Sequence, residues 1–130
     1  MTPRLYAIDS DVEHERLEAQ AALAGIEDHL RHVPLRPGDR VLDAGCGSAA
    51  MGRAMAAACP EAHITGLDRR STYLDFARER AAADRLTNVD VTTGDLFALP
   101  FADASFDGVW TKYVLQWLAE PVAALAELKR

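Results

Sequence analysis

The sequence predicts an α/β domain with a doubly wound parallel sheet, and three observations lead to this fold class. Short apolar runs begin near residues 41, 63, 89 and 106, and each has the length of one buried strand. Helical segments separate the first three runs, which allows a crossover helix between parallel strands. The chain has 130 residues, 49% of them hydrophobic, and this length and composition predict a single domain with one core.

The leading segment, residues 1–36, predicts a helix. Ser10-Asp11-Val12-Glu13 places a hydroxyl and a carboxylate at the spacing of a capping box. Behind this box, apolar residues recur at intervals of three and four: Leu23, Ile26, Leu30 and Val33. Pro37-Gly38-Asp39 then breaks the chain into a turn, so we expect the core of the domain to occupy residues 37–130.

Strands and helices alternate through this core. The predicted strands are residues 41–44, 63–67, 89–92 and 106–110. The predicted helices are residues 51–59, 71–83, 112–119 and 121–130, the last with Pro121 at its start. The connection from 94 to 105 predicts a loop. This alternation is typical of a parallel sheet with helices on both faces.

Composition excludes several classes of protein. The 20 acidic and 14 basic residues give a net charge of −6, which argues against a broad nucleic-acid-binding face. No apolar run approaches the ~20 residues that cross a bilayer, and the first residues lack the apolar core of a signal peptide. The two cysteines, Cys46 and Cys59, form neither a disulfide framework nor a zinc motif, which favours the cytoplasm.

A glycine-rich turn follows the first predicted strand. That strand ends at Asp43 and Ala44, and Gly45-Cys46-Gly47 leads from it into the next helix. Glycines let the backbone approach a ligand closely, and the start of the helix offers N–H groups to an anionic group. A tight turn without any ligand is the alternative interpretation.

Asp68 closes the second predicted strand. A carboxylate at this place can accept hydrogen bonds from both hydroxyls of a ribose. The alternatives are a helix N-cap or a solvated acid with Arg69 and Arg70 as neighbours. Together with the glycine-rich turn, Asp68 favours nucleoside binding.

Gly94-Asp95-Leu96 directly follows the third predicted strand. Ligands of open parallel sheets lie outside the carboxyl ends of the strands, so Asp43, Asp68 and Asp95 would line one crevice. The Asp95 carboxylate could accept from an exocyclic amine and the Leu96 N–H could donate to a ring nitrogen, which would select adenine. A simple Gly-Asp turn is the alternative.

These motifs, followed by Leu99-Pro100-Phe101 and Phe106-Asp107-Gly108-Val109, occur in the order found in class I S-adenosylmethionine-dependent methyltransferases. The chain resembles that family over about residues 35–130. The resemblance implies a Rossmann-like sheet of about four strands in the order 3-2-1-4, and methyl transfer from S-adenosyl-L-methionine to a small-molecule oxygen, nitrogen or carbon. No residue can be named as the general base.

The resemblance also implies where the cofactor binds. Gly45 and Gly47 would adjoin its methionine part, Asp68 would bind the ribose and Arg69 would lie against the adenine. The expected cofactor-binding residues are Asp43, Gly45, Cys46, Gly47, Asp68, Arg69, Gly94, Asp95, Leu96, Trp110 and Thr111. Of these, Asp95 and Leu96 would bind the base edge, and Trp110 and Thr111 would flank the methionine part. The region of Tyr6 and Gln20 resembles the segment that covers the cofactor in many relatives.

The chain departs from the family pattern in two ways. Ala49 stands where many relatives have a third glycine. The family sheet has seven strands, and this chain stops after the helix that follows the fourth strand. We therefore expect the domain to be truncated at its C-terminus, with an unpaired edge along residues 106–110 that a second chain could cover.

Two other functions remain open. A nicotinamide-dependent oxidoreductase shares a glycine turn followed by an acid, but its Gly-x-Gly-x-x-Gly motif would place a glycine at Ala50. A methyltransferase-like module without catalytic activity would retain the fold, with or without nucleoside binding. His29 and His32 have the spacing of a metal pair, but no third ligand accompanies them, so no metal is expected. Lys112, Tyr113, Gln116 and Trp117 could face the substrate or pack inside.

Overall fold

The computed structural model describes Leu30, residues 33–111, Leu118 and residues 120–129 of the chain. Its elements are β1 (Arg40–Ala44), α3 (Ala50–Ala58), β2 (His63–Asp68), α4 (Ser71–Ala83), β3 (Val89–Thr93), β4 (Gly108–Trp110) and α5 (Pro121–Lys129). Several predictions lie outside the described residues: the capping box, the leading-helix residues before Leu30, Tyr6, Gln20, His29, His32, and the helix predicted over 112–119 with its four candidate substrate-facing residues.

The four strands form one parallel sheet in the order β3-β2-β1-β4, which confirms the predicted fold class and strand order. The first three strands and the helices α3, α4 and α5 lie within one or two residues of their predicted bounds. The fourth strand begins at Gly108, two residues later than predicted. Phe106 lies in the preceding loop, where its ring packs edge-to-face on Phe101 with the ring centroids 4.9 Å apart.

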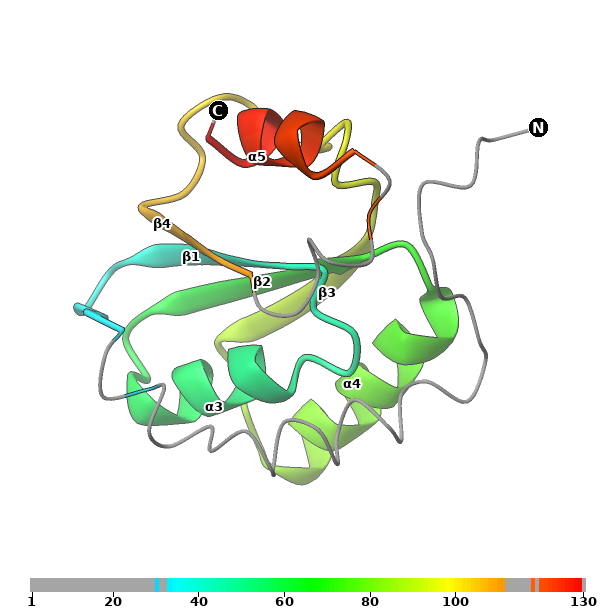
Figure 1. The fold of residues 1–130 in the computed structure, drawn as a ribbon. Coiled ribbons are helices and arrows are strands. Elements are labelled where there is room, and N and C mark those ends of the chain that lie inside the picture. Colours follow the sequence, from blue (N-terminus) through cyan, green and yellow to red (C-terminus); the bar gives the residue numbers. More distant parts are fainter. Residues whose placement is uncertain (1–29, 31–32, 112–117, 119, 130) are drawn as a thin grey trace.

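Helices cover both faces of the sheet. Figure 1 shows α3 and α4 side by side below the sheet and α5 above it. Because neighbouring residues of a strand point to opposite faces, Val41 packs against the α3 side and Leu42 against the α5 side. The α3 side also contains Met51, Met55, Ala56, Ala62 and Ile64, and the α5 side contains Ala44, Leu67, Leu96, Leu118 and Ala124.

Asn88, just before β3, joins three segments of the chain. Its side-chain nitrogen lies 2.9 to 3.1 Å from the carbonyl oxygens of Ala56, Cys59 and Ala62. These carbonyls belong to the end of α3 and to the connection that leads to β2. One amide therefore satisfies polar groups that the end of a helix leaves without intrahelical partners.

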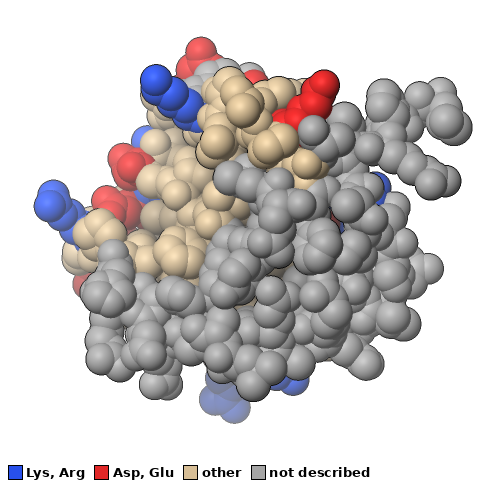
Figure 2. Space-filling view, in the orientation of Figure 1, with Lys and Arg blue, Asp and Glu red and all other residues tan. Residues whose placement is uncertain are grey.

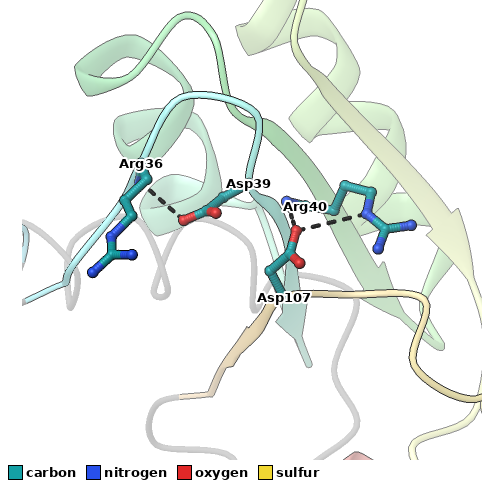
Figure 3. A network of polar contacts seen from close by, with 4 residues as sticks. All are labelled: Arg36, Asp39, Arg40 and Asp107. Carbon is teal, nitrogen blue, oxygen red and sulfur yellow. Dashed lines mark hydrogen bonds and ion pairs between the residues drawn. The ribbon is translucent and has the colours of Figure 1, made fainter.

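A polar network joins the amino ends of β1 and β4 (Figure 3). One oxygen of Asp107 accepts the main-chain N–H of Arg40 at 2.8 Å and lies 3.6 Å from its Nε. The N–H of Asp107 donates in turn to the carbonyl of Arg40 at 2.7 Å. Beside them, the N–H of Arg36 donates to Asp39 at 2.9 Å. This network lies at the opposite end of the strands from the glycine-rich turn.

In the described part of the chain, no helix combines the length and the apolar character needed to cross a membrane.

Candidate functional site

The turn between β1 and α3, residues 45–49, has an unusual backbone. Gly45, Gly47 and Ala49 all have positive φ, at 67°, 56° and 60°. Two of these positions carry the residue type that adopts this conformation without strain, whereas Ala49 adopts it with a side chain present. The N–H of Cys46 donates to the carbonyl of Leu67 at 2.9 Å, which fixes the turn to the end of β2.

Asp68 links three segments at the carboxyl ends of the strands. Its Oδ2 accepts the N–H of Gly47 at 2.9 Å, and its Oδ1 accepts the N–H of Arg70 at 3.1 Å. Its carbonyl accepts the N–H of Gly94 at 3.1 Å. Burial raises the pKa of Asp68 above its usual value, while these two amides and the charge of Arg69 act in the opposite direction. Each carboxylate oxygen has a further lone pair with which to accept a ligand hydroxyl.

Asp43 is buried at the end of β1, with 4% of its surface exposed. Its Oδ2 accepts the N–H of Gly52, in the first turn of α3, at 3.1 Å. Burial is the main cause that raises the pKa of Asp43 from 3.8 to about 7; the hydrogen bond from the Gly52 amide acts against it, and the neighbouring charge of Asp68 adds to it. Asp43 therefore fixes the start of α3, a role that the sequence did not indicate.

Cys46 turns its side chain into the sheet. A Cβ atom added to Gly66 would lie 2.9 Å from the Cys46 sulfur and 3.1 Å from a methyl group of Val91, so only a glycine leaves room there. Burial and the nearby charges of Asp43 and Asp68 raise the pKa of the Cys46 thiol, which keeps it protonated. Cys46 thus supports the turn by packing and is not a reactive thiolate.

The segment after β3 contains both the predicted turn and the predicted carboxylate. The N–H of Phe97 donates to Asp95 Oδ1 at 2.8 Å, and the N–H of Ala98 donates to the Asp95 carbonyl at 3.1 Å. The carboxylate is thereby held in one orientation at the end of β3. The Leu96 side chain is 2% exposed and packs on the α5 side, so a contact from this residue to a ligand would come from its main chain.

Trp110 ends β4 directly beside Asp43 of β1. The next residue, Thr111, has a hydroxyl oxygen that is buried and has no hydrogen-bond partner, and no other buried side-chain nitrogen or oxygen among the described residues is in this state. An unpaired buried hydroxyl is costly, and a bound ligand, water or ion would satisfy it.

The predicted site residues therefore gather at the carboxyl ends of the four strands. Hydrogen bonds join Asp68 to the glycine-rich turn and to Gly94. Asp43 is bonded to Gly52 of α3, and strand pairing places Trp110 next to Asp43. Arg69 is exposed beside Asp68. The sheet changes its winding direction between β1 and β4, and such switch points are where open α/β sheets bind ligands.

Arg53 is a residue of this region that the sequence analysis missed. It is buried in α3, and its Nε donates to the Ser48 carbonyl at 3.3 Å. A charged residue in the otherwise small and apolar segment Ala50–Ala58 is the signal that could have identified it. Among the described residues, no group of three or more His, Cys, Asp or Glu side chains could hold a metal ion.

Comparison with known proteins identifies relatives of this chain. The model of a family described as a methyltransferase domain matches residues 41–130. A malonyl-[acyl-carrier protein] O-methyltransferase of Erwinia pyrifoliae is 40% identical over 121 residues, which are 91% of this chain and 41% of that protein. A demethylmenaquinone methyltransferase of Geobacillus kaustophilus is 34% identical over 105 residues, which are 80% of this chain and 45% of that protein.

The fold is similar to that of solved structures. A SAM-dependent methyltransferase from Aquifex aeolicus superposes with a TM-score of 0.82 at 23% identity, over 95% of this chain and 67% of that one. At this identity the likeness concerns the fold alone. This chain spans less than half the length of the two curated relatives named above.

Proposed function

The chain belongs to the class I S-adenosylmethionine-dependent methyltransferases, and from this premise we propose that it binds S-adenosyl-L-methionine and transfers the methyl group to a small-molecule acceptor. The observation that carries the proposal is the joining of the glycine-rich turn to Asp68 through the Gly47 N–H, 2.9 Å from the carboxylate. This contact supports the proposal because it joins two of the motifs to which we assign the cofactor, at the switch point of the sheet.

The residues present fit this cofactor. Asp68 and Asp95 are hydrogen-bond acceptors held in fixed orientations, as ribose hydroxyls and an adenine amine require. The buried hydroxyl of Thr111 offers a further polar group at the end of β4. We assign the ribose to Asp68, the base edge to Asp95 and the main chain of Leu96, and the methionine part to residues 45–47, Trp110 and Thr111.

In the proposed mechanism the chain mainly binds and orients the reactants. When bound, the cofactor supplies a methyl group that its sulfonium already activates. The turn and Asp68 would hold the donor in one place, and its alignment with the acceptor would lower the entropic part of the barrier. Asp43 acts from behind the turn, where its carboxylate fixes the start of α3 through Gly52.

We propose a small-molecule acceptor because the relatives named above are a malonyl-[acyl-carrier protein] O-methyltransferase and a demethylmenaquinone methyltransferase. Both cysteines are free, which fits a reducing compartment, and we include a cytoplasmic location in the proposal. Family membership removes the support for the nicotinamide-dependent alternative. A module that binds the cofactor without catalysis is an outcome that the experiment below distinguishes.

We further propose that another strand pairs with the open edge of β4, supplied by a longer polypeptide or by a second chain. Among the described strands, β4 pairs with β1 alone. Val109 is 42% exposed on this strand, and Val122 and Leu125 of α5 are 78% and 47% exposed. Figure 2 shows residues other than Lys, Arg, Asp and Glu over the middle of this region, with charged residues around them. Light scattering on the 130-residue chain should show self-association; a monomer that melts cooperatively and binds no apolar dye would contradict this proposal.

Two measurements test the proposed function. Isothermal titration should show binding of S-adenosylhomocysteine and no binding of NAD, and the reverse result would overturn the proposal. Transfer of radiolabelled methyl to a panel of carboxylate, phenol, quinol and amine acceptors then separates an enzyme from a binding module. Binding of S-adenosylhomocysteine without any transfer would identify the module.

A further inference from the structure

The buried polar and charged residues of the described chain lie around one feature. They are Asp43, Ser48 and Arg53, which are 4%, 1% and 8% exposed. Asp43 precedes the glycine-rich turn, Ser48 lies within it and Arg53 follows it in the first turn of α3. The least solvated polar groups of the described fold are thus concentrated on this turn.

Arg53 connects the turn to a second helix. Its Nε donates to the carbonyl of Ser48 at 3.3 Å, and its Nη1 lies 3.7 Å from a carboxylate oxygen of Asp84. Asp84 directly follows α4, and its N–H is bonded to the carbonyl of Arg80 at 3.0 Å. The guanidinium therefore spans from the turn to the end of α4, with 9% of the Arg53 side chain exposed.

No side-chain cap supports the turn at the start of α3. Ala49 occupies the N-cap position of α3 in a left-handed conformation and provides no side-chain cap. Behind it lies a cavity of about 260 Å³, which Ala49 and Arg53 line together with residues of α4 and β3. Packing from α4 does not fill the space behind the turn, and Arg53 supplies a directed hydrogen bond there.

We propose that Arg53 is a positioning residue that holds residues 45–49 in the shape required by the methionine end of the cofactor. The inference rests on the proposed function, since it assigns the methionine end to this turn. Arg53 itself would not contact the cofactor. It acts through the Ser48 carbonyl, and Asp84 fixes the guanidinium in place.

The test compares two ligands and two arginines. Arg53→Met keeps much of the side-chain volume and removes the guanidinium. Arg78→Met is the matched control, because Arg78 lines the same cavity but bonds to Asp75 and the Val91 carbonyl instead of the turn. Binding of S-adenosylhomocysteine and of adenosine is measured by calorimetry. Hydrogen exchange is followed at the Ala49 amide, which donates to the Cys46 carbonyl at 2.8 Å within the turn.

We expect Arg53→Met to raise the dissociation constant of S-adenosylhomocysteine by roughly three- to tenfold, as the loss of one net hydrogen bond implies. Adenosine lacks the methionine part, so its dissociation constant for Arg53→Met should lie within about twofold of the wild-type value. Exchange at the Ala49 amide should become faster. Arg78→Met should change none of the three measurements.

Equal losses for both ligands would mean a general loss of structure and would overturn the proposal, as would unchanged S-adenosylhomocysteine binding. If Arg53→Met does not fold, Arg53→Lys takes its place, because lysine keeps the charge but cannot donate from the Nε position. If the wild-type chain binds neither ligand, the proposed function has failed. Hydrogen exchange then still tests the positioning role of Arg53: an Ala49 amide that exchanges at the wild-type rate in Arg53→Met would overturn it.

Discussion

The main-chain N–H of Gly47 donates to the carboxylate of Asp68 at 2.9 Å, and this bond joins the turn after β1 to the end of β2. The sequence suggested that the turn offers its amides to an anionic ligand. The Gly47 amide instead binds an anion of the protein itself, and that anion is the proposed ribose-binding group. A substitution at Asp68 therefore alters both the ligand contact and the turn.

The first prediction concerns Asp68. Asp68→Ala should raise the dissociation constant of S-adenosylhomocysteine by roughly ten- to hundredfold, because a hydrogen bond to a charged group contributes about 1.5–3 kcal/mol. Asp68→Asn should lose less, since its amide oxygen can still accept one main-chain N–H. Calorimetry measures both, with Asp75→Ala on the exposed surface of α4 as the control. An unchanged dissociation constant in folded Asp68→Ala would remove this residue from the site.

The second prediction concerns Asp95 and the base edge. Asp95→Asn keeps an oxygen that accepts the Phe97 N–H, so the local turn should persist. Its new NH₂ group donates where the carboxylate accepted, which disfavours the amine of adenosine and favours the carbonyl of inosine. The ratio of the two dissociation constants should shift toward inosine by roughly tenfold. Parallel changes for both nucleosides would show that Asp95 does not contact the base edge.

The third prediction concerns the packing of Cys46 on Gly66. Gly66→Ala places a methyl group 2.9 Å from the Cys46 sulfur, and such overpacking costs about 1–3 kcal/mol. Cys46→Ala in the same chain should recover part of this loss, because the sulfur is removed while the 3.1 Å contact with Val91 remains. Urea denaturation of the two single variants and the double variant measures the coupling.

Gly108→Ala is the control for this prediction, because nothing lies within 4 Å of the added Cβ atom. A cost for Gly66→Ala no larger than that for Gly108→Ala would contradict the packing argument.

The fourth prediction concerns pH. The folded chain raises the pKa of Asp43 from 3.8 to about 7. Below pH ~4 this group is protonated in both states, and as the pH rises toward 7 the unfolded state loses its proton first, so the stability of the fold decreases. Asp43 alone accounts for a slope of up to about 1.4 kcal/mol per pH unit.

Asp43→Asn does not titrate and still offers an oxygen to the Gly52 N–H. Its free energy of unfolding should therefore depend less on pH between 4 and 7 than that of the wild type. Denaturant titrations of both proteins at several pH values give the two curves. Parallel curves for Asp43→Asn and wild type would contradict the raised pKa.

Local sequence patterns were sufficient to predict most of the fold. Apolar runs gave β1 and β2 because their side chains are buried on both faces of the sheet, and α4 was predicted with its observed bounds. The start of β4 was predicted too early because Phe106 is apolar and matches the pattern of a strand residue. Phe106 lies in the loop before β4, where it packs against Phe101. Apolar character alone does not distinguish a strand residue from a buried loop residue.

Site chemistry was harder to predict because it depends on contacts between distant residues. Asp43 was predicted as a cofactor-binding residue from its place at the end of a strand, and nothing near it in the sequence indicates that its carboxylate also accepts the N–H of Gly52. Arg53 was missed for the same reason, since its partner Asp84 follows a different helix. Asp68 could be predicted as a candidate because the end of a parallel strand is a place that the sequence pattern itself defines.

The paired bonds between Arg40 and Asp107 set the register of β4 against β1. β4 has only three residues, and a slip by one would exchange the faces on which Val109 and Trp110 lie. Such a slip would also break both bonds at the amino end of the strand. These two hydrogen bonds at the far end of the sheet thus help to specify which residue lies beside Asp43 at the carboxyl end, and where the buried Thr111 hydroxyl lies.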